Sequence, residues 1–138
     1  MHQKNILVSI LINNYNNELF IKRCVQSCLN QSYKNIEIII YDDLSNDKSK
    51  KYIKNIKSKR VKKIFNKKKY FKTGRLNQLN AIKRSFIRSK GEIIFLLDTY
   101  LLMAGQCRVF YSLYFNCVSG KIKKLVLKNK LSFRITRF

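Results

Sequence analysis

The stretch from Ile36 to Asp47 constrains the fold of this chain more than any other. It reads Ile-Glu-Ile-Ile-Ile-Tyr-Asp-Asp-Leu-Ser-Asn-Asp, a run of mostly β-branched apolar residues that ends in two adjacent carboxylates. A continuous apolar run between turn-forming residues is typical of a strand buried on both faces of a parallel sheet. Asp42 and Asp43 then stand at the carboxyl end of that strand, the edge at which open α/β sheets bind their ligands.

Strand-like and helix-like segments alternate along the chain. Strands are predicted at residues 6–12, 36–41, 61–65 and 92–98; helices are predicted at residues 18–30, after Asp47 (with Tyr52, Ile53 and Ile56) and at residues 75–89 (with Leu79, Ile82 and Phe86 on one face). This alternation predicts βαβ units, and so an α/β fold with a mostly parallel sheet and flanking helices. Asn16 or Asn17 is expected to cap the first helix.

Three interpretations of the carboxylates at the strand ends follow from the residues alone. Asp42, Asp43 and Asp98 end two different strands, and in a parallel sheet those ends share one edge. Such acids can hold a divalent cation such as Mg²⁺ or Mn²⁺, accept hydrogen bonds from a base and a ribose, or cap helices and pair with lysines. Neither a dinucleotide nor a P-loop glycine motif occurs, and the single histidine, His2, excludes a Ser-His-Asp triad.

The charge balance favours anionic partners. The 138 residues include 30 Lys and Arg but only 7 Asp and Glu, a formal net charge of +23. Nucleic acid, an anionic membrane surface and phosphorylated substrates all suit such a field. A nucleic-acid partner is disfavoured, because no RNA-binding or helix-turn-helix pattern accompanies the lysines. No signal peptide is visible, so a cytoplasmic location is expected; Cys24 and Cys28 should pack as thiols in the core.

Several spaced motifs together resemble the start of the family 2 glycosyltransferases. They are Val8–Ile12, Tyr15-Asn16 and Glu18, Ser27, Gln31 and Tyr33, Glu37–Ile40, Asp42-Asp43 with Ser45 and Asp47, Leu79–Ala81, and Gly91–Asp98. The resemblance covers residues 6–98 and implies the nucleotide-sugar-binding, Rossmann-like half of a GT-A fold. It implies a nucleotide-diphospho-sugar donor, a glycan or lipid acceptor and inverting transfer in polysaccharide or cell-envelope assembly.

The resemblance also assigns the site residues. It implies that Tyr15, Asn16 and Glu18 line the nucleotide pocket, that Asp42 and Asp43 read the base or ribose, and that Asp98 meets the ribose or the metal. Tyr100 stands where the second, metal-binding acid of this motif is usual, so the implied Mg²⁺ or Mn²⁺ site is weakened.

Two further departures concern turns and the catalytic base. Leu44 stands where the family has glycine and is expected to avoid a positive φ. The sequence has no Asp or Glu from Thr99 to Phe138. No catalytic base is assigned, and the family resemblance implies a truncated chain of doubtful activity.

The chain is predicted to divide into a glycosyltransferase-like domain at residues 1–100 and a divergent apolar and basic tail at residues 101–138. The tail is interpreted as a surface-lying helix at an anionic inner membrane face, a spanning helix, part of a core, a disordered end or the product of a frameshift. A non-catalytic basic module that binds polyanions is the alternative function.

Overall fold

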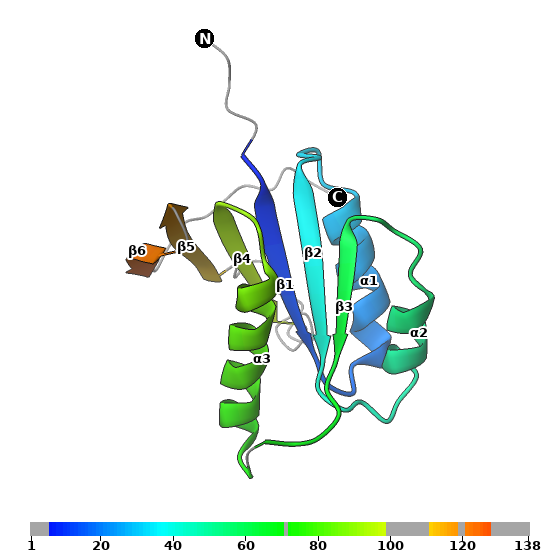
Figure 1. Cartoon of the computed structure of the whole chain (residues 1–138). Coiled ribbons are helices and arrows are strands. Elements are labelled where there is room, and N and C mark those ends of the chain that lie inside the picture. The colour runs from blue at the N-terminus through cyan, green and yellow to red at the C-terminus, as the bar shows by residue number, and fades with distance from the viewer. Residues whose placement is uncertain (1–5, 71, 99–110, 119–120, 128–138) are drawn as a thin grey trace.

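The computed structural model describes residues 6–70, 72–98, 111–118 and 121–127, with side chains for residues 6–70 and 72–97. The described strands form one sheet with α1 and α2 on one face and α3 on the other (Figure 1). The strands are β1 (Val8–Asn14), β2 (Ile36–Asp42), β3 (Val61–Phe65), β4 (Ile93–Asp98), β5 (Tyr111–Val118) and β6 (Lys121–Leu127), and the helices are α1 (Glu18–Leu29), α2 (Ser49–Asn55) and α3 (Gly74–Arg88).

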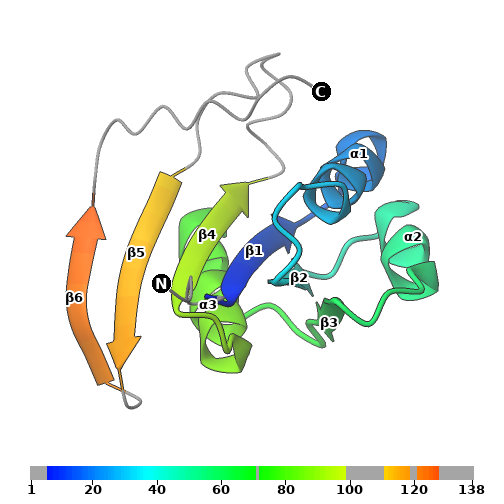
Figure 2. The same ribbon diagram turned by 90° about the horizontal axis from the view of Figure 1, so that it is seen from above.

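The strand order is β3-β2-β1-β4-β5-β6. The first four strands in this order run parallel to one another, whereas β5 is antiparallel to β4 and β6 to β5. Seen from above, β5 and β6 continue the sheet on the side away from α1 and α2 (Figure 2). The predicted α/β class, with a mostly parallel sheet and flanking helices, is confirmed.

The isoleucine run of β2 is buried because helices cover both faces of the sheet. Ile38 and Ile40 belong to the core cluster under α1 and α2, and Ile39 belongs to the cluster on the α3 face. All three have 0% of their surface exposed. Cys24 and Cys28 are buried free thiols of α1, as predicted.

Three details differ from the sequence prediction. The first strand extends through Asn14 and begins at Val8 rather than residue 6. Leu79, Ile82 and Phe86 were predicted to share one face of the third helix, but Leu79 is 56% exposed whereas Phe86 packs against the core. The backbone at 111–118 is a strand, so a surface-lying or spanning helix there is wrong. The predicted domain boundary falls in 99–110, outside the described residues.

No helix among residues 6–70 and 72–98 combines the length and the apolar composition that a bilayer-spanning segment requires.

A buried carboxylate links the amino ends of the parallel strands. Glu37 Oε1 accepts a hydrogen bond from Ser9 Oγ at 2.5 Å, and Lys62 Nζ donates to Oε2 at 2.6 Å. The Lys90 N–H also donates to Oε1, and the Gly91 N–H donates to Ser9 Oγ at 2.8 Å. Residues at or beside β1, β2, β3 and β4 therefore meet at this acid, on the edge opposite the predicted site.

Acid should weaken this network. Burial opposes the charged form, but hydrogen bonds from Lys62, Ser9 and Lys90 outweigh it and lower the pKa of Glu37 from its ordinary value of 4.5. The carboxylate thus contributes stability that is fully present above about pH 4.5 and is lost as the pH falls through the lower folded-state pKa. We expect Glu37→Gln to cost about 1–3 kcal/mol at pH 7. In urea titrations this difference should shrink below pH 4.5; a constant difference down to pH 3 would contradict the assignment.

Gly91 is required by close packing rather than by a turn. A Cβ at this position would lie 2.5 Å from Ser9 Oγ, 2.6 Å from Ser9 N and 2.9 Å from Leu7 O, two of them backbone atoms. We expect Gly91→Ala to destabilise the fold by about 1–3 kcal/mol. Gly74→Ala is the matched control, because nothing lies within 4 Å of its added Cβ. Thermal unfolding should give Gly91→Ala a lower melting temperature than Gly74→Ala. Equal melting temperatures would show that a side chain at residue 91 is not crowded.

Candidate functional site

The carboxyl ends of β1 and β2 bring two polar loops together. Asn14 is the register partner of Asp42, and the Asp43 N–H donates to the Asn14 carbonyl at 2.9 Å. The loops that follow, residues 15–17 and 43–48, lie at the lower edge of the sheet in Figure 1. This edge holds five of the predicted site residues: Tyr15, Asn16, Glu18, Asp42 and Asp43.

A buried amide joins the two loops. Asn14 Nδ2 lies 2.9 Å from Asp42 Oδ1, 3.1 Å from Ser45 Oγ and 3.0 Å from Ser49 Oγ. The Ser45 N–H donates to the other oxygen of Asp42 at 3.3 Å. Asp42 is 0% exposed. In this arrangement both Asp42 oxygens hold the loop in shape, and the carboxylate has no surface open to a ligand.

Two acids hold the starts of α1 and α2 in a reciprocal way. Asp47 Oδ2 accepts from the Glu18 N–H at 2.9 Å, and Glu18 Oε2 accepts from the Lys48 N–H at 2.8 Å. Asn17 precedes α1 but makes no side-chain cap. The prediction that Asn16 or Asn17 caps this helix is therefore wrong, since Asp47 supplies the acceptor from the neighbouring loop.

Asn16 fastens the same two loops from the other side. Its N–H donates to Ser45 Oγ at 3.0 Å, and its Oδ1 accepts from the Asn46 N–H at 2.9 Å. Asn16 adopts a positive φ of 48°, which asparagine tolerates better than most residues. An open hollow of about 320 Å³ lies beside it. Its lining includes the acids Glu18 and Asp47, so it is a poor place for a diphosphate.

Asp43 stays partly exposed, unlike its buried neighbour Asp42. Its Oδ1 accepts from Asn66 Nδ2 at 2.6 Å, and the Asn66 N–H donates to the Asp42 carbonyl at 2.8 Å. Asn66 follows β3, is 6% exposed and was missed by the sequence analysis. Its position directly after a predicted strand, like that of Asp42 and Asp43, was the signal that could have identified it.

Aromatic and cationic side chains contact each other in the segments that follow β1 and β3. Lys69 Nζ lies 5.4 Å from the centroid of the Tyr15 ring, and the Arg84 guanidinium lies 4.4 Å from that of Tyr70. Tyr15 is 50% exposed, so its ring is available for stacking. Burial raises the pKa of Tyr41, whose hydroxyl has no hydrogen-bond partner among the described residues. The edge thus combines an acid, an exposed ring and cations.

The metal prediction lies partly outside the described residues. Asp98 ends β4 and pairs in register with Asn13, so its backbone reaches the same edge. The Asp98 side chain and Tyr100 are not among the described parts. The described side chains contain no group of three or more His, Cys, Asp or Glu that could hold a metal ion. The residues described do not fit a complete metal site by themselves.

The sequence profile of glycosyl transferase family 2 matches residues 9–99. The chain belongs to this family. An uncharacterised glycosyltransferase of Haemophilus influenzae is 52% identical over 61 residues, which cover 43% of this chain and 24% of that protein. The Escherichia coli protein named UDP-Glc:alpha-D-GlcNAc-diphosphoundecaprenol beta-1,3-glucosyltransferase WfaP is 51% identical over 55 residues, which cover 40% of this chain and 22% of that protein.

Solved structures share the GT-A fold with this family 2 chain. Staphylococcus aureus TarS 1–349 superposes with a TM-score of 0.55 at 18% identity, over 72% of this chain and 31% of TarS. The mannosyltransferase PcManGT of Pyrobaculum calidifontis, in complex with GDP-Man and Mn²⁺, gives 0.56 at 16% identity, over 70% of this chain and 28% of that one. The chain spans about a quarter of the length of the curated relatives that it matches.

Leu44 differs from the sequence expectation. It was expected to avoid a positive φ, but its φ is 62°. Its neighbours force this conformation, because Asp42 Oδ2 holds the Ser45 N–H and the Asp43 N–H is bound to Asn14. A leucine in the left-handed region costs about 1–2 kcal/mol relative to the right-handed one.

We expect Leu44→Gly to stabilise the protein by about 0.5–1 kcal/mol, since relief of the Cβ clash exceeds the entropy that glycine loses on folding. The measurement is the free energy of unfolding in urea. Leu44→Ala keeps the Cβ and should give no gain. Equal stabilisation by both substitutions would show that the leucine side chain, rather than the backbone, is the source.

Proposed function

We propose that this family 2 chain binds a nucleotide-diphospho-sugar donor at the carboxyl edge of β1, β2 and β4. The observation that carries the proposal is the partly exposed carboxylate of Asp43, positioned by Asn66 at 2.6 Å. A carboxylate so placed can accept hydrogen bonds from a base N–H or a ribose hydroxyl. The edge of a parallel sheet is also where α/β folds bind nucleotides.

The remaining roles at the site follow from the surrounding side chains. The half-exposed Tyr15 ring offers a face for stacking the base, and the Asn16 backbone lies beside it. Lys68, Lys69 and Arg84 lie over the rings of Tyr15 or Tyr70 and suit the diphosphate. Asp42 and Glu18 act indirectly, because their carboxylates hold backbone N–H groups of the loops that shape the pocket.

Donor binding should depend only weakly on Mg²⁺ or Mn²⁺. A divalent cation would use Asp98 and would neutralise the diphosphate as it leaves. Tyr100 occupies the position of the second acid, and a neutral phenol is a poor ligand for a hard cation. PcManGT, which shares the fold, binds Mn²⁺ together with GDP-Man, and Tyr100 at the second acid position argues for weak metal binding in this chain.

The proposed reaction is inverting transfer of the sugar to a glycan or lipid-linked acceptor in cell-envelope polysaccharide assembly. The name of the Escherichia coli relative supports such an acceptor. In-line displacement needs a base for the acceptor hydroxyl. Residues 99–138 contain no Asp or Glu. We propose that this chain alone binds the donor without transferring the sugar at a useful rate, and that its site is located at the cytoplasmic side of the membrane.

The test is calorimetric titration with UDP-, GDP- and CDP-sugars, with and without Mn²⁺. We expect one nucleotide class to bind, with little change on adding Mn²⁺. Asp43→Asn should weaken that binding about 10- to 100-fold, because a charged acceptor is lost. Glu92→Gln is the matched control, since it removes the same charge at the opposite edge of the sheet. Absence of binding by every nucleotide sugar would refute the proposal.

A further inference from the structure

Helix α3 presents three large apolar side chains to solvent, Leu76, Leu79 and Ile87, whereas Phe86 packs against the core cluster on this face of the sheet. The residues that it buries against the sheet are the small or polar Asn77, Ala81 and Ser85. Its exposed residues include Leu76 at 44%, Leu79 at 56% and Ile87 at 69%. A usual surface helix turns its apolar stripe to the core, whereas α3 leaves these three large apolar side chains outside it.

The exposed apolar residues form a single stripe on α3. At about 100° per residue, positions 76, 79, 83 and 87 fall within one side of the helix, opposite the buried side chains. Figures 1 and 2 show α3 on the outside of the sheet, on the face away from α1 and α2. In the described part of the chain, the stripe faces away from the core. We call Leu76, Leu79, Lys83 and Ile87 the outer face of α3.

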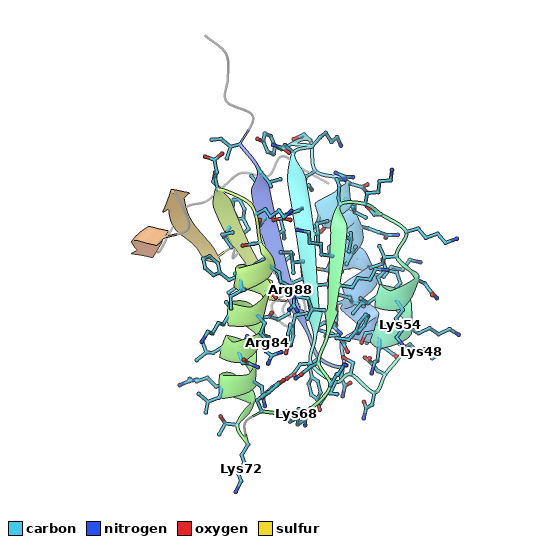
Figure 3. All side chains as sticks on the ribbon, in the orientation of Figure 1. Lys48, Lys54, Lys68, Lys72, Arg84 and Arg88 are labelled. Carbon is cyan, nitrogen blue, oxygen red and sulfur yellow. The ribbon has the colours of Figure 1, made fainter. Side chains whose placement is uncertain are left out.

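Cations lie within and beside this outer face, and residues 72–91 contain no Asp or Glu. Lys72, Arg75, Lys83 and Lys90 are all exposed. Figure 3 shows Lys72 extending away from the sheet beside the N-terminal end of the helix. Residues 48–91 contain 18 Lys and Arg and no Asp or Glu. An apolar stripe flanked by cations is the pattern of a helix that lies in the interface of an anionic membrane.

We propose that the outer face of α3 docks on an anionic lipid bilayer. Leu76, Leu79 and Ile87 enter the boundary between headgroups and acyl chains, and Arg75 and Lys83 contact lipid phosphates. The apolar stripe favours a bilayer over a nucleic acid, because the phosphate backbone of a nucleic acid offers no apolar site for exposed leucine and isoleucine side chains. A second copy of the chain is disfavoured, since it would bring the same net charge of +23 to the contact.

This surface is independent of donor binding. The outer face of α3 points away from the sheet, whereas Asp43 and Asn66 lie at the ends of the strands. Arg84, which stacks on Tyr70, belongs to the other side of the helix. Docking through α3 would therefore hold the chain at a membrane without using the nucleotide site.

The test is co-sedimentation of the full 138-residue chain with vesicles. Vesicles of phosphatidylcholine alone are compared with vesicles that also contain phosphatidylglycerol. We expect binding to the anionic vesicles only, and its loss in about 1 M salt. The triple variant Leu76→Ser, Leu79→Ser, Ile87→Ser should reduce the partition coefficient about tenfold or more. Because these side chains are exposed, its melting temperature should match that of the wild type.

A matched pair of charge variants locates the contact. Arg75→Gln with Lys83→Gln should weaken binding to anionic vesicles about tenfold. Lys51→Gln with Lys57→Gln removes the same charge from exposed positions at α2, on the opposite face, and should have a clearly smaller effect. Equal losses in the two pairs, or unchanged binding by the triple serine variant, would overturn the proposal. The proposal would also be overturned if the wild type were a dimer, the triple serine variant a monomer, and neither protein bound vesicles.

Discussion

The hydrogen bond between Asn14 and Asp42 is the interaction on which the carboxyl edge depends. It joins the last residues of two adjacent parallel strands, 2.9 Å apart, in a position closed to water. A buried carboxylate is costly unless donors surround it. Here the amide of Asn14 and the backbone of Ser45 supply those donors, so the negative charge fixes the loop instead of destabilising it.

Once that bond is made, the geometry of the next residues follows. Asp43 is turned by its N–H toward the Asn14 carbonyl, and Leu44 is left in the left-handed region. Asp47 then reaches the start of α1, and Glu18 reaches the start of α2. Each helix start is therefore held by a side chain from the start of the other helix or from the loop before it. The site at this edge is formed by two segments, and neither could form it alone.

The parts of the fold that repeat a local pattern were predictable from the sequence. The isoleucine run of β2 and the apolar residues of α1 are nearly sufficient to place those elements. A strand buried on both faces gives a continuous apolar run, and a helix buried on one face gives apolar residues at helical spacing. The cap of α1 was not predictable, since Asp47 and Glu18 are 29 residues apart and only the tertiary structure brings them together. Asn66 was missed although its position directly after a predicted strand was visible in the sequence; its contact with Asp43, 23 residues away, was not. The strain at Leu44 arises from hydrogen bonds to its neighbours, which override the preference of leucine.

Helix α3 shows a different limit of sequence reasoning. Its period is clear, but the fully buried residues are the small or polar Asn77, Ala81 and Ser85. Of the apolar residues that the sequence placed on one face, Phe86 packs against the core and Leu79 is exposed.

The acids explain how the two surfaces of this chain can remain separate. Every Asp and Glu from Glu18 to Asp98 lies at or near an edge of the parallel strands. Glu37 and Glu92 are at the amino edge, and Glu18, Asp42, Asp43, Asp47 and Asp98 are at the carboxyl edge. The outer face of α3 then carries cations unopposed by any acid. A base or ribose needs acceptors, which only the edge supplies, whereas a lipid headgroup needs cations beside apolar side chains. The distribution of charge thus gives the donor and the bilayer different places on one small domain.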